Sequence, residues 1–71
     1  MKLKELGNVC HKCALHLIDI TKHPGIDCGS VNADYFNEVG DIEKYHDYEV
    51  VNIYPNDENC SSMLRVEIKE K

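Results

Sequence analysis

The clearest alternation of apolar and polar positions lies near the end of the chain. From Met63 to Lys69, Leu64, Val66 and Ile68 fall on one side of an extended chain and charged residues on the other. This alternation is typical of a strand with one buried face. The segment Glu49–Tyr54 (E-V-V-N-I-Y) is β-rich and followed by proline, which predicts a second strand. We expect the two strands to form an antiparallel C-terminal hairpin whose apolar face packs on helices.

The first third of the chain predicts a helix and then a strand. Lys2–Val9 places two leucines three residues apart, as on one face of a short helix. Cys13–Ile20 (C-A-L-H-L-I-D-I) contains β-branched residues and predicts a strand. One long helix that ends at His23-Pro24-Gly25 is the alternative. Its buried face would carry Leu3, Leu6, Cys10, Cys13, Leu17 and Ile20, which follow a spacing of three and four.

The middle of the chain is less regular. Thr21–Asn32 contains glycine, proline and scattered polar residues, which predicts a loop. Ala33–Val39 fits either a strand or a helix, whereas Asp41 is a suitable N-cap for a short helix over Ile42–His46. Together these elements predict one small α+β domain over residues 1–71. It would have a short N-terminal helix, a three- to four-stranded antiparallel sheet with the C-terminal β-hairpin, and one short connecting helix.

Length and composition narrow the class of protein. The chain has 71 residues, of which 42% are hydrophobic and 30% charged, so a folded domain is expected rather than a disordered tail. No apolar stretch approaches the roughly 20 residues of a membrane span, and no export signal is visible, which predicts a soluble cytoplasmic protein. A domain this small is marginally stable, so a bound metal or self-association could support it. The sequence contains no complete catalytic constellation, and we expect a binding protein rather than an enzyme.

Negative charge is concentrated in the middle of the chain. The net charge is −5, and residues 32–58 carry eight acids against the single Lys44. These acids are Asp34, Glu38, Asp41, Glu43, Asp47, Glu49, Asp57 and Glu58. Such a field repels phosphate and attracts a basic surface, so the segment favours a basic protein partner over direct nucleic-acid binding.

The aromatic residues share this span. Tyr35, Phe36, Tyr45, Tyr48 and Tyr54 are all the rings of the chain. Tyrosine is enriched at protein interfaces, although the same rings could instead form the small core. On the interface reading, the partner-binding residues are Asp34, Tyr35, Glu38, Asp41, Glu43, Tyr45, Asp47, Tyr48 and Glu49.

Cysteine and histidine spacing suggests a metal site. Cys10 and Cys13 form a C-x2-C pair and His23 precedes Cys28 by five positions, which together make a possible Cys3His zinc set. A strand over Cys13–Ile20 would hold the two pairs apart, in which case His16 or Cys60 could supply the missing ligand. The alternative is that these thiols are reduced and fill the core. A redox role for C-H-K-C would need a βαβ setting that the sequence does not show.

The two ends of the chain carry a resemblance. M-K-L-K-E-L and the pair D-Y-E-V-V-N-I-Y-P and L-R-V-E-I resemble small uncharacterised proteins of phages and prophages in Gram-positive gut bacteria. The resemblance implies an accessory protein of a mobile element that acts in the cytoplasm of the host bacterial cell. It also implies a strand end and then a short helix over Val39–Tyr48. The C-H-K-C segment departs from the pattern, so no role for it follows from the resemblance.

These observations lead to three hypotheses of function. The first is a protein that binds and inhibits or modulates a host protein with a basic surface, such as a nucleic-acid-binding defence protein, as anti-CRISPR and other anti-defence proteins do. The second is a zinc-stabilised structural or interaction module that uses Cys10, Cys13, His23 and Cys28. The third is a homo-oligomer, formed through the edge of the C-terminal hairpin, that contacts nucleic acid through Lys2, Lys4 and Lys12.

Overall fold

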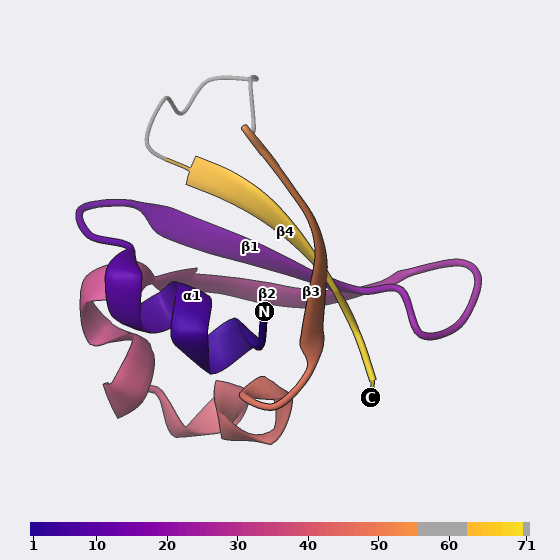
Figure 1. Ribbon diagram of the computed structural model, residues 1–71, viewed down its shortest axis with the longest axis horizontal. Helices are drawn as coiled ribbons and strands as arrows, with labels where there is room; N and C mark the ends of the chain where they lie inside the picture. The colour runs from indigo at the N-terminus through magenta and orange to yellow at the C-terminus, as the bar shows by residue number, and fades with distance from the viewer. Residues whose placement is uncertain (56–62, 71) are drawn as a thin grey trace.

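The described part of the chain folds into a helix, four strands and two 3-10 helices. The computed structural model describes residues 1–55 and 63–70. In chain order the elements are α1 (Leu3–Val9), β1 (Ala14–Asp19), β2 (Ile26–Asn32), the 3-10 helices η1 (Ala33–Glu38) and η2 (Gly40–Tyr45), β3 (Glu49–Pro55) and β4 (Met63–Lys69) (Figure 1). The α+β class is therefore confirmed. The polar connection between the two hairpin strands lies outside the described residues.

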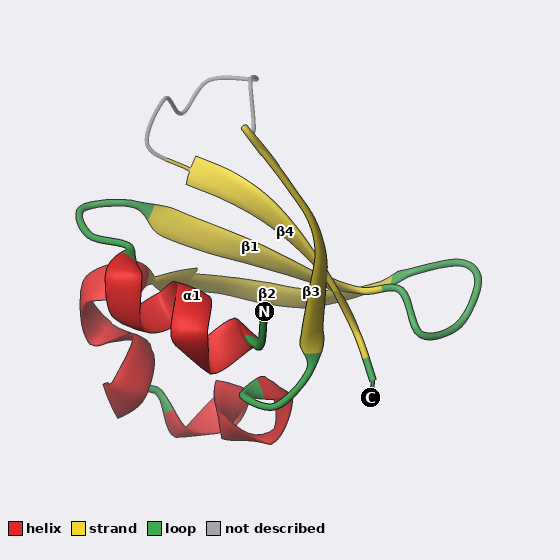
Figure 2. Ribbon diagram, viewed as in Figure 1, coloured by secondary structure: helices red, strands yellow, loops and turns green. Residues whose placement is uncertain are grey.

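The four strands form one mixed sheet in the order β2-β1-β4-β3. β1 pairs antiparallel with β2, and β3 pairs antiparallel with β4, which confirms the C-terminal hairpin. β1 and β4 run parallel, so the prediction of a wholly antiparallel sheet was wrong (Figure 2). β1 and β4, the strands with the most buried residues, occupy the centre, where a neighbouring strand on each side removes their main-chain groups from water. Their relative direction follows from the path of the intervening chain.

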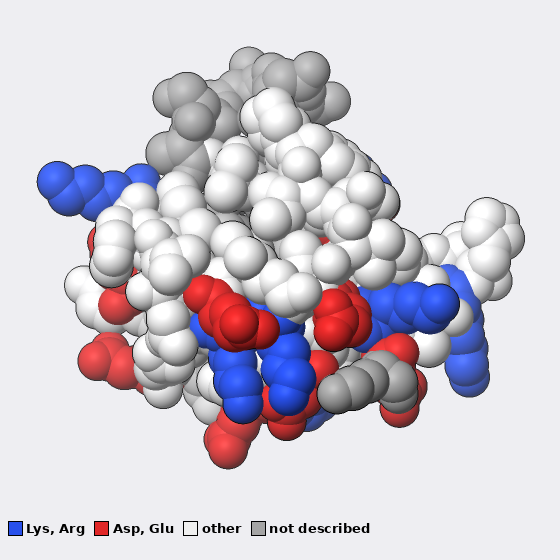
Figure 3. All heavy atoms as spheres, viewed as in Figure 1, with Lys and Arg blue, Asp and Glu red and all other residues white. Residues whose placement is uncertain are grey.

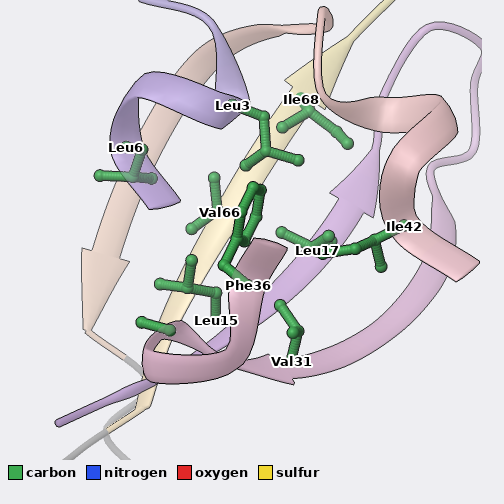
Figure 4. Close-up of a cluster of buried hydrophobic side chains, with 10 residues drawn as sticks. Leu3, Leu6, Leu15, Leu17, Val31, Phe36, Ile42, Val66 and Ile68 are labelled. Carbon is green, nitrogen blue, oxygen red and sulfur yellow. The ribbon is translucent and has the colours of Figure 1, made fainter. Parts of the chain in front are cut away.

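The core lies between one face of the sheet and the helices. Leu15, Leu17, Val66 and Ile68 project from the central strands and are fully buried. Phe36 of η1, only 1% exposed, lies among these side chains (Figure 4). The Phe36 ring thus fills the space over the two central strands. This buried ring holds η1 on the sheet, so the helix needs no regular amphipathic pattern.

Helix α1 is fixed at its start by both side-chain and main-chain contacts. Glu5 accepts a hydrogen bond of 2.8 Å from the main-chain N–H of Lys2, which satisfies one free donor of the first turn. Leu3 and Leu6 are buried, as the three-residue spacing predicts. The main chain of Lys2 also forms an antiparallel bridge with Glu49, so the N-terminal segment lies beside the start of β3.

Several predictions for the middle of the chain were wrong. Thr21–Asn32 is not one loop, because Ile26–Asn32 forms β2, an edge strand with one buried residue and no alternating pattern to reveal it. Of the two readings of Ala33–Val39, the helical one is closer, since η1 covers all of it except Val39. Val39 is extended but belongs to no strand, so the strand end implied at that position is absent.

The second short helix begins earlier than predicted. η2 starts at Gly40 rather than Ile42, so Asp41 lies inside its first turn and is not the N-cap. Val39 occupies the cap position without a side-chain hydrogen bond. Ile42 is buried and holds the helix on the core, which explains why it forms without an N-cap side chain. None of the helices in residues 1–55 and 63–70 is long and apolar enough to cross a membrane.

Candidate functional site

Two of the acids expected on a binding surface pair with nearby positive groups. The carboxylate of Asp47 lies 3.2 Å from the ammonium of Lys4 and 3.8 Å from that of Lys2. The hydrogen bond from Lys4 is the main cause that lowers the pKa of Asp47. Glu49 lies 3.2 Å from the N-terminal ammonium. Acidic and basic side chains accordingly lie side by side along the lower edge of the molecule (Figure 3), and these two acids attach α1 to the start of β3.

Asp34 holds the C-H-K-C loop. Its Oδ1 accepts a hydrogen bond of 3.2 Å from the main-chain N–H of Lys12 and lies 3.6 Å from Nδ1 of His11. Lys12 has a left-handed φ of 57°, which a non-glycine residue adopts when its surroundings hold it there. Asp34 therefore connects η1 to the loop between α1 and β1, a role that the charge pattern did not predict.

The remaining acids of the predicted set are exposed and free. Glu38 of η1 and both Asp41 and Glu43 of η2 are exposed, and their carboxylates have no ion pair or hydrogen bond within residues 1–55 and 63–70. Tyr35, in the same stretch of nine residues, is 57% exposed. We call Tyr35, Glu38, Asp41 and Glu43 the 3-10 surface. It keeps an aromatic ring and negative charges available to a partner.

The other two tyrosines of the predicted binding set pack against the core. Tyr45 and Tyr48 are half-buried against the core and meet edge to face, with ring centres 5.1 Å apart. A hydrogen bond with Cys28, followed by burial, raises the pKa of Tyr45 to about 12. Loss of solvation raises the pKa of Tyr48 as well. These two tyrosines therefore close one end of the core, and the core reading is correct for them and for Phe36.

The predicted zinc ligands lie in separate parts of the fold. Cys10 and Cys13 flank the loop before β1, whereas Cys28 contacts Tyr45 and His23 lies in the turn after β1. Ala14, which follows Cys13, is paired with Asn32 at the end of β2. Cys28 lies four residues before Asn32, so about 14 Å of β2 separates it from the end of the sheet where Cys13 lies. In the described ranges, no three His, Cys, Asp or Glu residues are grouped closely enough to hold a metal ion. Cys60 lies outside those ranges, so the zinc site stays a prediction.

Cys10 does not have the lowered pKa of a reactive cysteine. Burial is the first cause that raises the pKa of Cys10, and the neighbouring Cys13 raises it further. A raised pKa reduces the thiolate fraction at neutral pH, whereas a reactive cysteine needs a lowered one. Cys10 also follows the C-terminal end of α1 rather than the start of a helix. Although basic neighbours such as His11 and Lys12 can lower the pKa of a thiol, the pKa of Cys10 is raised.

Sequence reasoning missed a polar network on the sheet face opposite the helices. The registers place Ser30, His16, Arg65 and Tyr54 in one row across the four strands. Nε2 of His16 lies 2.9 Å from Oδ1 of Asp27, and the guanidinium of Arg65 lies 5.7 Å from the ring centre of Tyr54. No single segment contains this set, because adjacent members come from different strands. The sequence contains one indication of the network: the alternating pattern of β4 predicts that its charged residues lie on the face opposite the core.

The second row of the same face is joined around Glu67. The carboxylate of Glu67 accepts hydrogen bonds from the hydroxyl of Tyr54 and, at 3.0 Å, from the amide of Asn52. These two bonds, that from Tyr54 first, lower the pKa of Glu67. The pKa of Asp27 is also lowered, first by the main-chain N–H of Gly29 and then by His16. Each carboxylate therefore has its partners within the network, which joins neighbouring strands rather than leaving groups free for a ligand.

These lowered pKa values predict a pH dependence of stability. A carboxyl whose pKa is lower in the folded state than its unfolded value, 3.8 for Asp27 or 4.5 for Glu67, stabilises the fold when ionised. That contribution is complete above the unfolded value and is lost as pH falls through the folded one. We expect the free energy of unfolding to fall between about pH 5 and 2 in urea titrations. The variants Asp27→Asn and Glu67→Gln should show a shallower fall, while Ser30→Ala on the same face should follow the parent.

Comparison with known proteins adds no assignment to this geometry. Searches against protein-family models, curated proteins and solved structures find no match for the chain.

Proposed function

We propose that this chain is a protein-binding module whose 3-10 surface contacts a basic region of a partner protein. The observation that carries the proposal is that Glu38, Asp41 and Glu43 are exposed without a basic partner in the described part of the chain. Other acids of the same span have such partners. Unpaired charges keep their full attraction for an incoming basic surface, and the exposed ring of Tyr35 adds contact area at low entropy cost.

The partner that fits this surface is a protein with clustered lysine and arginine. Basic clusters are typical of nucleic-acid-binding proteins, so occupying one would block the nucleic acid by competition. The resemblance of the chain ends to phage and prophage proteins supports a bacterial host protein as the partner, bound in the host cytoplasm. An inhibitor or modulator of a host defence protein, of the anti-CRISPR kind, is the function that we propose on these grounds.

Neutralising the surface tests the proposal. We expect the triple variant Glu38→Gln, Asp41→Asn, Glu43→Gln to bind the partner at least about tenfold more weakly, because three attractive charges are lost. The parent chain would be immobilised to capture its partner from a bacterial lysate, and the purified partner then titrated by calorimetry. Parent binding should also weaken as salt rises from about 0.05 to 0.5 M, since screening reduces attraction between opposite charges.

A charge-matched control separates the effect of the 3-10 surface from the effect of the net charge of the chain. The triple variant Ile26→Lys, Ser30→Lys, Glu70→Gln changes the net charge by the same +3 at exposed sites outside η1 and η2. It should keep the affinity of the parent. Equal binding by parent and neutralised variant, or a captured partner without basic clusters, would contradict the proposal.

A further inference from the structure

The two edges of the sheet differ in their protection against pairing with another strand. β2, one edge, carries the charged Asp27 and a left-handed glycine, Gly29, with φ of 88°. Charge and irregular backbone on an edge discourage a further strand from adding there. β3, the opposite edge, has no charged residue from Val50 to Pro55, and its own irregular step, between Val50 and Asn52, and its proline lie at the two ends of this stretch. Its side chains Val51, Ile53 and Tyr54 are 45%, 43% and 37% exposed.

The first part of β3 is already covered on its outer side. The N-terminal segment pairs with it through the Lys2–Glu49 bridge, and the main-chain N–H of Val50 donates to the carbonyl of Met1 at 2.8 Å. From Val51 to Pro55, β3 has β4 as its only neighbouring strand in the part of the chain that the structure describes. Between the irregular step and Pro55, which has no N–H to donate, the exposed and uncharged residues Asn52, Ile53 and Tyr54 form a short template for one more antiparallel strand.

We propose that this edge pairs with the β3 edge of a second copy of the chain. A two-fold axis at Ile53 would place Ile53 opposite its equivalent and Asn52 opposite Tyr54, so the same short segment supplies both sides of the contact. Asn52 and Tyr54 project to the same side of the sheet, since strand side chains alternate. The pairing continues the antiparallel arrangement of β3 and β4 into a sheet that spans both copies.

Charge favours a second copy at this place over other places. Each copy carries a net charge of −5, so most approaches bring like charges together. The surface over the middle of β3 is uncharged in the view of Figure 3, whereas acidic and basic groups lie side by side along the lower edge. Two copies that meet at Ile53 therefore bring no charged residue of the stretch Val50–Pro55 into the contact. Their remaining repulsion acts over longer range, and added salt should reduce it and strengthen the dimer.

Concentration-dependent sedimentation tests the pairing. A contact limited to one strand pair is at the low end of interface sizes, so we expect a dissociation constant of about 10–100 µM. Sedimentation equilibrium of the full chain between about 5 and 500 µM should show a monomer–dimer equilibrium that tightens from 0.05 to 0.5 M salt. This salt dependence is opposite to that of the proposed partner binding, so the two results can be told apart.

The same substitution on the two edges provides a matched comparison. Ile53→Lys on β3 should raise the dissociation constant at least about tenfold, because two lysines would meet at the axis. Ile26→Lys on β2, where the isoleucine is 57% exposed, should leave it unchanged. Val51→Lys is a second β3 variant, and circular dichroism melting checks that each variant is folded. A parent chain that stays monomeric at the highest concentration, or equal effects of Ile53→Lys and Ile26→Lys, would overturn the inference.

Discussion

Replacing Phe36 with alanine should lower the free energy of unfolding by about 3–5 kcal/mol, the usual cost of removing a buried aromatic ring. Phe36 is 1% exposed and lies among the buried side chains over the central strands. Its ring also stacks on His46, with centres 4.8 Å apart and planes 18° apart. Alanine would leave a cavity under η1, a 3-10 helix too short to stay folded without that packing.

The size of the domain makes this loss easy to measure. A chain of 71 residues is expected to have a total stability of about 4–10 kcal/mol, so Phe36→Ala should remove a large part of it. Urea titration followed by far-ultraviolet circular dichroism gives the difference. Tyr35→Ala, the adjacent ring at 57% exposure, should change stability by less than about 0.5 kcal/mol. A loss of under about 1.5 kcal/mol for Phe36→Ala would show that the ring is not the centre of the core.

Gly7→Ala should destabilise the protein by about 1–3 kcal/mol, although alanine normally favours a helix over glycine by about 0.5–1 kcal/mol. A Cβ at Gly7 would lie 2.4 Å from Cδ1, 2.5 Å from Cγ and 2.7 Å from Cδ2 of Phe36. These distances are far below a carbon–carbon contact, so either the ring or α1 must move. The overlap therefore outweighs the gain in helix propensity.

A double-mutant cycle tests the stated cause. If the clash with Phe36 is responsible, Gly7→Ala should cost less in a Phe36→Leu background, and the two effects should depart from additivity by at least about 0.5 kcal/mol. Gly40→Ala is the control, because a Cβ there meets no atom within 4 Å. It should be close to neutral in the same urea titration. Additive effects of Gly7→Ala and Phe36→Leu would contradict the explanation.

The close contact of Gly7 with Phe36 also shows how far local patterns extend. Glycine and asparagine are common where a helix ends, yet α1 continues through Gly7 and Asn8 to Val9 and uses the glycine for a close approach to the ring. Both uses of glycine are physically sound, and a single segment cannot distinguish them. The partner that decides between them, Phe36, lies 29 positions further along the chain.

The candidate surface shows the same limit. Nine residues were expected to bind a partner, and the structure leaves four of them as the exposed 3-10 surface. Asp34, Asp47 and Glu49 pair with His11, Lys4 and the N-terminus, which are distant in sequence. Tyr45 and Tyr48 pack on the core. Charge counting along the chain predicts the field of a segment, but it cannot predict which charges find partners across the fold.

Local periodicity was sufficient to predict the helix or strand where an element buries one of its faces. Met63–Lys69 alternates and forms β4 with those bounds, and the paired leucines of the N-terminal helix are buried as expected. The preference of β-branched residues likewise identified β1 against the long-helix alternative. The sequence by itself thus determined the α+β class, the N-terminal helix, the C-terminal hairpin and the net negative charge.

Tertiary structure alone decided the pairing of β1 with β2 and with β4. β2 has little apolar pattern because an edge strand is held mainly by main-chain hydrogen bonds to one neighbour, and these carry no side-chain signature. The parallel pairing of β1 with β4 buries the same side chains as an antiparallel one would, so hydrophobicity does not choose between them. The grouping of cysteines, acids and the polar network depends on that arrangement, because each group joins residues that only the folded sheet brings together.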